Sequence, residues 1–441
     1  MGKDLTPESV TSIRQTLENA CADQERGIPG VTFVVADREG KQLFAHAAGK
    51  RGKGVDEPMT LDSVYWIASF TKMITGIACM QLVEQGKLSL YDAGQIESLC
   101  PELKELKVLQ KDGTVVEKKR EISLRMLLTH TGIFLSPPPK LISPHPGSRV
   151  FCISRRCVRD YNRPIGFDEF SGHVYDVTQP LIFQPGEGFE YGVGIDWAGI
   201  AVERVTGLLL NDYFHKYIFE PLGLKNISML PSAEMKARLA YMHSRNPDGT
   251  LSQRDHLLRW PLLAKNKEET KGMLNSGGAG CFSTSQDYLA REANASRTYH
   301  PDPDILTTLL NDGTSPKTGK QILTKSTVDL MFQNHIPHMP NFGRQGNLLN
   351  KKPDLVNNVP DIYPLNNNEP QGWGLSFMIT SSLTGRSVKS AMWAGIANLF
   401  WWCDREHGIA GVICTQILPF ADAKLVPLWF DVEKKVYDGL K

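Results

Sequence analysis

The pattern of apolar positions predicts a long helix in the first quarter of the chain. Apolar residues recur at intervals of three and four across 67–85, and Gly86 follows as a stop signal. The repeated positions are Ile74, Ile77, Ala78, Leu82 and Val83. A second, amphipathic helix is expected over 6–22, because it opens with a threonine cap, a first-turn proline and an acidic residue.

Runs rich in strand-forming residues occur near both ends of the chain. Residues 31–36 and 43–48 flank the turn sequence 37–40 and predict a hairpin. Four further strands are expected near the C-terminus, at 374–380, 387–393, 398–403 and 408–417. Helical patterns occupy the region between and the end of the chain, at 121–129, 195–205, 208–219, 324–334 and 423–440.

This order predicts an α/β (α+β) fold, in which an antiparallel sheet built from both chain ends is flanked by helices and carries an inserted, mainly helical lobe. We expect 1–60 and 270–441 to form the sheet lobe and 61–269 the helical lobe. Three stretches rich in turn-forming or polar residues are expected to be loops, and the two longest are candidate lids. They are 136–164, 246–255 and 339–371.

Composition narrows the function classes. The 441 residues include 49 Lys and Arg against 48 Asp and Glu, a net charge of +1, so no long-range field favours nucleic acid or an anionic membrane. No apolar run approaches the ~18 residues of a membrane helix, and the charged N-terminus lacks the apolar core of a secretory signal. The eight cysteines form no C-x-x-C. We therefore expect a cytoplasmic monomer without a metal site or disulfide framework.

A candidate nucleophile opens the long helix. Ser69 and Lys72 are three residues apart, which places them on one helical face. A serine hydroxyl needs an adjacent base, and a lysine can be that base only when it is uncharged, a form that burial favours. The spacing also fits a serine cap beside a solvated lysine. The apolar residues on both sides of the pair favour the buried alternative.

Two later segments offer partners for this serine. Tyr191 ends a Gly-rich, aromatic stretch before the 195–205 helix, where a phenol could pass protons, although a packing tyrosine in a turn fits as well. Residues 393–396 end a strand with small residues, where a backbone can approach a ligand closely, and an ordinary hairpin bend is the alternative.

Two other features are expected to lie outside the chemistry. Lys317-Thr318-Gly319 spells the K-T-G triad of penicillin-recognising enzymes, but it follows the turn sequence 311–316, and we expect a surface loop. His130 is expected to be a structural histidine. The sequence contains no G-x-S-x-G, H-E-x-x-H or Walker motif.

Taken together, these segments resemble the serine β-lactamase and penicillin-binding-protein superfamily. Within it, the chain looks most like the class C-like esterases and the fungal transesterases of polyketide pathways, and the stretch from Tyr191 to Gly199 is very similar to the tyrosine segment of such a transesterase. The matching segments, in order, are Ser69-Phe70-Thr71-Lys72, Leu127-Leu128-Thr129-His130-Thr131-Gly132, Pro185-Gly186 through Tyr191, Gly277-Gly278-Ala279-Gly280-Cys281-Phe282-Ser283-Thr284 and Trp393-Ala394-Gly395.

The resemblance implies a role for each residue. Ser69 would be the acylated nucleophile, Lys72 its base and Tyr191 the general acid and base. Trp393-Ala394-Gly395 would replace K-T-G, and the oxyanion amides would come from Ser69 and Ile396. Two departures disfavour a β-lactamase or D-aminopeptidase: Trp393 cannot hold a substrate carboxylate as a lysine does, and Val193 replaces the asparagine of the Y-x-N motif.

We therefore predict a serine acyltransferase of secondary metabolism that forms an acyl-enzyme and needs no cofactor. It would move an acyl group from a small ester or thioester, or from an acyl carrier, to a hydroxyl acceptor. A carboxylic-ester hydrolase on the same site is the first alternative, and a non-catalytic scaffold of the same fold is the second. Trp66 and Trp401 are proposed as aromatic walls for a bulky apolar substrate.

Overall fold

One large antiparallel sheet organises the chain in the computed structural model. The structure describes residues 3–110, 114–132, 168, 170–289, 305–344, 354–357 and 369–441. The sheet has seven strands in the order β10-β11-β12-β13-β14-β1-β2, so strands from the two ends of the chain meet where β14 pairs with β1. This confirms the predicted fold class. The division into lobes at residues 61 and 270 stays a prediction.

The N-terminal elements follow the predicted pattern. Helix α1 (Pro7–Ala22) begins at Thr6, whose side chain accepts a hydrogen bond from the Ser9 amide. Strands β1 (Gly30–Asp37) and β2 (Gln42–Gly49) form the expected hairpin. Every residue of β1 is buried, because this strand is paired on both edges and covered on both faces.

The C-terminal strands are shorter than predicted. The expected strand 374–380 is instead the hairpin of β10 (Gly372–Trp373) and β11 (Met378–Ile379), whose turn includes Ser376 at φ 89°. The expected strand 387–393 begins later, as β12 (Ala391–Gly395). The remaining elements are β13 (Leu399–Asp404), β14 (Ile409–Cys414), β15 (Ile417–Leu418) and α15 (Leu425–Gly439).

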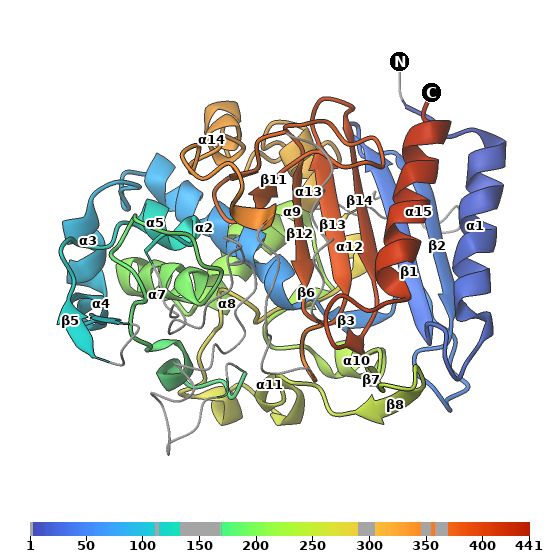
Figure 1. Ribbon diagram of the computed structural model, residues 1–441, viewed down its shortest axis with the longest axis horizontal. Coiled ribbons are helices and arrows are strands. Elements are labelled where there is room, and N and C mark those ends of the chain that lie inside the picture. Colours follow the sequence, from blue (N-terminus) through green and yellow to red (C-terminus); the bar gives the residue numbers. More distant parts are fainter. Residues whose placement is uncertain are drawn as a thin grey trace, which may run out of the picture.

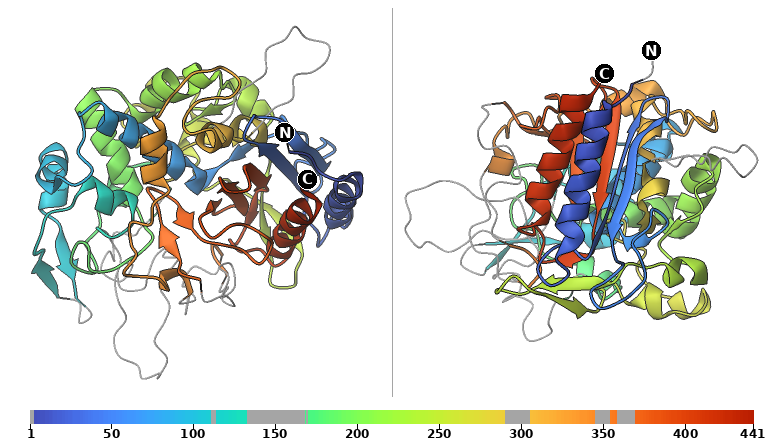
Figure 2. Two further views of the ribbon diagram at one scale, coloured as in Figure 1. Left: turned by 90° about the horizontal axis from the view of Figure 1, so that it is seen from above. Right: turned by 90° about the vertical axis from the view of Figure 1, so that its right-hand side faces the viewer.

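Helices cover both faces of the sheet (Figures 1 and 2). On one face, α1 packs along α15, and the chain ends are tied by the bond from the Thr6 amide to the Gly439 carbonyl. On the other, α12 (Ser285–Tyr288) and α13 (Ile305–Leu310) contact β1, β13 and β14. The helical part lies beyond β12, at the left of Figure 1.

The helical part is centred on α2 (Thr71–Glu84), which follows the 3₁₀ turn η1 (Ala68–Phe70) and packs against α7 (Gly194–Thr206). Helix α7 ends one residue beyond the predicted range 195–205, and Gly207 follows it with a left-handed φ of 71°. The other helical elements are α3 (Ala93–Leu99), α4 (Pro101–Lys104), α5 (Leu124–Leu128), η2 (Val174–Val177), α8 (Leu210–Phe214), the π-helical turn η3 (His215–Phe219), α9 (Glu220–Leu222), α10 (Ala233–Ala237), α11 (Trp260–Leu263), η4 (Glu268–Thr270), α14 (Lys325–Met331) and η5 (Phe342–Arg344).

Three small sheets complete the described structure. Strands β3 (Val64–Trp66), β9 (Phe282–Thr284) and β6 (Ile227–Ser228) form one, and β4 (Lys107–Leu109) pairs with β5 (Val115–Glu117). The expected loop 246–255 is wrong in part, because β7 (Met242–Arg245) and β8 (Leu251–Arg254) form a hairpin there, with β15 beside β7.

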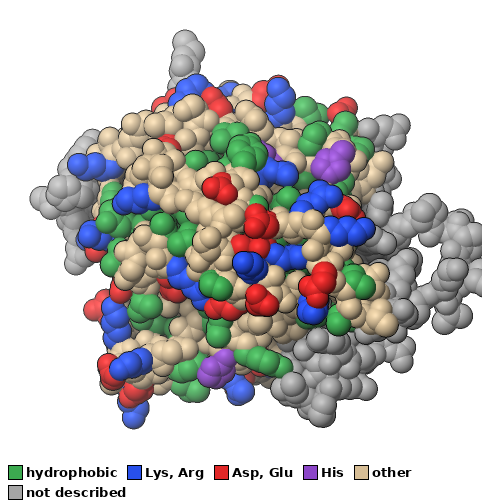
Figure 3. Space-filling view, turned by 90° about the vertical axis from the view of Figure 1, so that its left-hand side faces the viewer, with side chains coloured by type: hydrophobic (Ala, Val, Ile, Leu, Met, Phe, Trp, Pro, Cys, Tyr) green, Lys and Arg blue, Asp and Glu red, His purple; other side chains and the backbone are tan. Residues whose placement is uncertain are grey.

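Charges of both signs lie together on the face at the helical end of the molecule. Figure 3 shows basic and acidic side chains intermixed there. Among the described residues, none of the helices combines the length and the apolar character that crossing a bilayer requires.

Candidate active site

Ser69 lies in a tight turn between a strand and a buried helix. Strand β3 pairs with β9, and the chain then turns through η1 into α2. Ala68 has a φ of 45°, a left-handed conformation that is costly for an alanine and typical of residues at functional turns. All other residues of 63–82 are buried, whereas Ser69 is partly exposed. The turn therefore presents one hydroxyl at the surface of an apolar frame.

Lys72 is held beside this hydroxyl. Its side chain is only 4% exposed, and its Nζ lies 3.0 Å from Ser69 Oγ. The same nitrogen donates to the Gly278 carbonyl at 2.8 Å, which fixes the amine between the turn 276–280 and the serine. An amine buried here with only neutral acceptors is placed to exchange a proton with Ser69.

Tyr191 reaches the serine from the opposite side. Its hydroxyl donates to Ser69 Oγ at 2.7 Å, and Lys72 Nζ lies 4.7 Å from the centre of its ring. His130 supports the tyrosine from behind. Its Nδ1 accepts from the Gly192 amide at 3.3 Å, its carbonyl accepts from the Glu190 amide, and its ring packs 4.7 Å from that of Tyr191. Burial, aided by the positive charge of Lys72, holds the pKa of His130 well below its usual value.

The end of β12 closes the cluster. The indole N–H of Trp393 donates to the Tyr191 hydroxyl oxygen at 3.0 Å. A Cβ added to Gly395 would lie 2.8 Å from the Ile67 carbonyl, so this strand end touches the turn that carries Ser69. Ala394 and Ile396 are 4% and 7% exposed and flank this contact. The structure thus brings Ser69, Lys72, Tyr191 and the 393–396 strand end together.

A buried aspartate near Lys72, with the hydrogen bonds that hold it, was not identified from the sequence. Asp196, on α7, accepts hydrogen bonds from Ser276 Oγ at 2.6 Å and from the Gly278 amide at 3.0 Å. Thr75 Oγ1 donates to the neighbouring Gly277 carbonyl at 2.7 Å. Burial raises the pKa of Asp196, and the positive charge of Lys72 opposes that rise. An aspartate between Ile195 and Trp197, in an apolar helix start, was the available signal.

Two of the predicted substrate walls lie in the core instead. Trp66 is fully buried, and its indole N–H donates to the Ala279 carbonyl at 2.7 Å, which anchors the turn beside Lys72. Trp401 is 1% exposed and contacts Phe377 edge to face. Because both side chains are covered, neither presents a face to an open cleft, and this expectation is corrected.

The remaining predicted features lie elsewhere. Lys317-Thr318-Gly319 forms a turn in the segment after α13, outside the strands of the large sheet. Residues 136–164 and most of 339–371, the candidate lids, lie outside the described residues. In the part of the chain that the structure describes, no cluster of three or more His, Cys, Asp or Glu side chains has the arrangement of a metal site.

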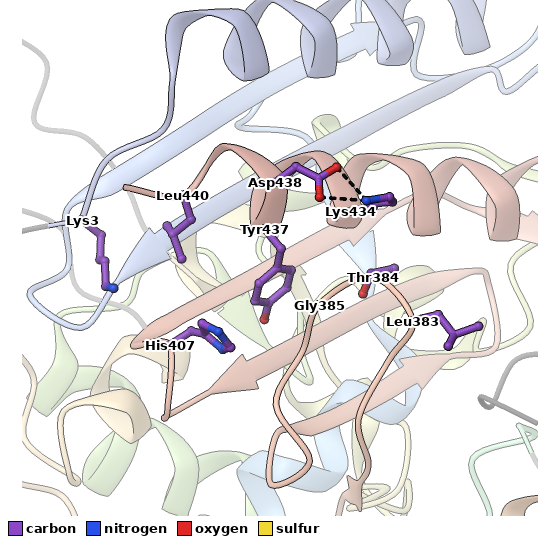
Figure 4. Close-up of a pocket in the computed structure, with 9 residues that line it drawn as sticks. All are labelled: Lys3, Leu383, Thr384, Gly385, His407, Lys434, Tyr437, Asp438 and Leu440. Carbon is purple, nitrogen blue, oxygen red and sulfur yellow. Dashed lines mark hydrogen bonds and ion pairs between the residues drawn. The ribbon is translucent and has the colours of Figure 1, made fainter. Parts of the chain in front are cut away.

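A cavity of about 500 Å³ lies beside α15, away from these residues (Figure 4). Its polar groups are bonded to neighbours: His407 Nδ1 and the Tyr437 hydroxyl both donate to Asp404 Oδ2, and Lys434 pairs with Asp438. Ser69, Lys72 and Tyr191 do not line it.

Known proteins share both the sequence and the fold. Residues 13–326 match the family Beta-lactamase. A lovastatin esterase of Penicillium rubens is 30% identical over 418 residues, covering 90% of this chain and 91% of the relative. The monacolin J acid methylbutanoyltransferase of Aspergillus terreus is 26% identical, covering 94% and 93%.

A solved structure agrees with these sequence matches. A mutant of the simvastatin synthase LovD from Aspergillus terreus superposes with a TM-score of 0.74 at 26% identity and covers 98% of this chain and 95% of its own. The family match spans most of the chain, and the relatives match it almost end to end. The chain therefore belongs to the Beta-lactamase family and is an enzyme of its esterase and acyltransferase group.

Proposed function

We propose that this enzyme transfers an acyl group from an ester or thioester to a hydroxyl of a secondary metabolite, through an acyl-enzyme on Ser69. One observation carries the proposal: Ser69 Oγ lies 3.0 Å from Lys72 Nζ and 2.7 Å from the Tyr191 hydroxyl. A non-catalytic scaffold has no need of a partly exposed serine with two proton-transfer groups on opposite sides.

The first half-reaction follows from this geometry. In its uncharged form, Lys72 takes the Ser69 proton as Oγ attacks the acyl carbon. The amides of Ser69 and Ile396 would stabilise the oxyanion, since the end of β12 touches the nucleophile turn. Tyr191 then gives its proton to the departing oxygen or sulfur. In the second half-reaction the acceptor hydroxyl enters, and the same groups act in reverse.

The residues around Tyr191 favour an uncharged acyl group. Trp393 is buried and hydrogen-bonded to Tyr191. Val193, two residues after Tyr191, has an apolar side chain. Neither supplies the cation that would hold a carboxylate near the reacting bond. The relative named as a methylbutanoyltransferase supports a short, apolar acyl group.

Hydrolysis of a carboxylic ester is the second candidate, and the 30% identity to a lovastatin esterase favours it. Both activities use the same acyl-enzyme and differ in whether water or a hydroxyl acceptor resolves it. The test is therefore to measure how the intermediate partitions.

Intact-mass spectrometry provides this test. The protein is incubated with p-nitrophenyl esters and N-acetylcysteamine thioesters of short branched acids, and each should add one acyl mass that Ser69→Ala abolishes while the fold persists. An added polyketide alcohol should then remove the adduct faster than water alone. Equal rates would support the hydrolase, and turnover by Ser69→Ala would overturn both candidates.

A further inference from the structure

The hydroxyl oxygen of Tyr191 accepts a hydrogen bond whose direction is fixed by its donor. An indole N–H donates and never accepts, so the 3.0 Å contact with Trp393 Nε1 occupies a lone pair on the phenol oxygen. The phenol hydrogen must then point elsewhere, and the neighbouring acceptor is Ser69 Oγ at 2.7 Å. Trp393 thus orients the tyrosine proton toward the reacting serine.

The indole itself is rigidly placed. Trp393 is 1% exposed, and its ring meets that of Trp373 edge to face with a centroid distance of 4.5 Å. Trp373 is anchored in turn, since its own N–H donates to the Leu128 carbonyl at 3.1 Å. Strand β12 is paired with both β11 and β13, which fixes the backbone that carries this indole.

On the basis of the proposed function, we propose that Trp393 is a positioning residue that aims the Tyr191 proton and stabilises the tyrosine phenolate formed when the leaving group is protonated. As the acyl carbon–oxygen bond of the ester breaks, the Tyr191 proton passes to the leaving oxygen. Lys72, which holds the former Ser69 proton, restores it to the phenolate. The net change is one ester and one Ser69 hydroxyl converted to an acyl-serine and an alcohol.

This role predicts a dependence on the leaving group. An alkoxide is a poor leaving group and needs the Tyr191 proton, whereas p-nitrophenolate leaves without one. A hydrogen bond from a neutral donor also strengthens when its acceptor becomes charged. Trp393 should therefore matter for alkyl esters and have little influence on p-nitrophenyl esters of the same acid.

Trp401 supplies a matched control. It stands directly opposite Trp393 in the β12–β13 register and is equally buried, at 1% exposed. In the described part of the chain its indole nitrogen makes no hydrogen bond. Trp401→Phe thus removes the same group from the same layer of the core without removing a bond to Tyr191.

The experiment compares single-turnover acylation of Ser69 by an ethyl ester and by the p-nitrophenyl ester of one acid. Trp393→Phe should slow acylation by the ethyl ester roughly 10-fold or more and by the p-nitrophenyl ester less than about twofold. Trp401→Phe should change both rates by the same factor. In a Tyr191→Phe background, Trp393→Phe should add no further leaving-group selectivity.

Equal losses on both esters, or the same selectivity without the Tyr191 hydroxyl, would overturn the inference. If Trp393→Phe does not fold, replacement of Trp393 by 3-benzothienylalanine, which keeps the ring shape and lacks the N–H, provides the same comparison. Failure of the proposed function is distinguishable, because no acyl mass would then appear on Ser69 in the unmodified enzyme.

Discussion

Two segments compete for the place that a Lys-Thr-Gly motif takes in penicillin-recognising enzymes. Lys317-Thr318-Gly319 has the letters, but it forms a turn in which Thr318 and Gly319 are exposed. Trp393-Ala394-Gly395 shares only the glycine, but it is a buried strand that bonds Tyr191 and touches the nucleophile turn. Position beside Ser69, rather than identity to the K-T-G motif, therefore makes Trp393-Ala394-Gly395 the segment that we propose to line the site.

The largest expected effects are those of replacing Lys72 and Tyr191, which lie beside the 393–395 segment and not beside 317–319. Lys72→Ala and Tyr191→Phe should each lower kcat at least 10²-fold, since each removes a group within 3.0 Å of Ser69 Oγ. Steady-state hydrolysis or transfer of an ethyl ester, whose leaving group needs a proton, measures this, with circular dichroism as the fold check. Tyr241→Phe, at an exposed position, serves as the control. Losses near twofold for the first two variants would remove their assigned roles.

The two glycines provide the direct comparison between the segments. Gly395→Ala places a Cβ 2.8 Å from the Ile67 carbonyl, so the strand end or the nucleophile turn must shift, and kcat should fall roughly 10- to 100-fold. Gly319→Ala meets no atom within 4 Å, but its φ is 68°. It should cost about 1 kcal/mol of stability in urea unfolding and leave kcat unchanged. Matching effects on kcat would contradict the comparison.

These differences show where sequence reasoning is sufficient. A spacing of three residues on a helix brings Ser69 and Lys72 onto one face whatever the rest of the fold, and the strands at both chain ends follow from their residue types. Residue type offered Tyr191 only as a candidate partner, and the resemblance assigned it to this pair, because 122 residues separate it from Ser69.

The errors have a common physical cause. Trp66 and Trp401 were expected on an open wall, but neighbouring elements cover both, and a residue type alone does not tell a wall from a core. Asp196 could not be identified from the sequence because its hydrogen bonds reach a turn 80 to 82 residues later. Tertiary contacts of this separation leave no local pattern along the chain.

The turn 276–280, which is bonded to Asp196, extends the comparison of glycines to a smaller expected effect. This turn contains glycine like 317–319, but it is closely packed. A Cβ on Gly278 would lie 2.4 Å from Asp196 Oδ2, whose carboxylate is held by Ser276 and by the Gly278 amide. Gly278→Ala should therefore displace the carbonyl that holds Lys72 and lower kcat roughly 10-fold, with a loss of thermal stability. Gly94→Ala, in α3 with its nearest contact at 3.4 Å, should be neutral or slightly stabilising. Full activity in Gly278→Ala would show that this carbonyl does not position the amine.

The smallest expected effect is that of replacing Lys317, although it belongs to a Lys-Thr-Gly sequence. If Lys317 held a substrate group as the lysine of a K-T-G motif does, Lys317→Ala would lower kcat/KM by orders of magnitude, because a charged contact near the reacting bond is lost. Lys317 lies instead beside Gly40, which is in the turn between β1 and β2. A Cβ added to Gly40 would lie 3.2 Å from the Lys317 side chain. We expect kcat/KM within about twofold and stability within about 0.5 kcal/mol of the unmodified enzyme. A large kinetic loss with an intact fold would return Lys317 to the site and contradict the role proposed for β12.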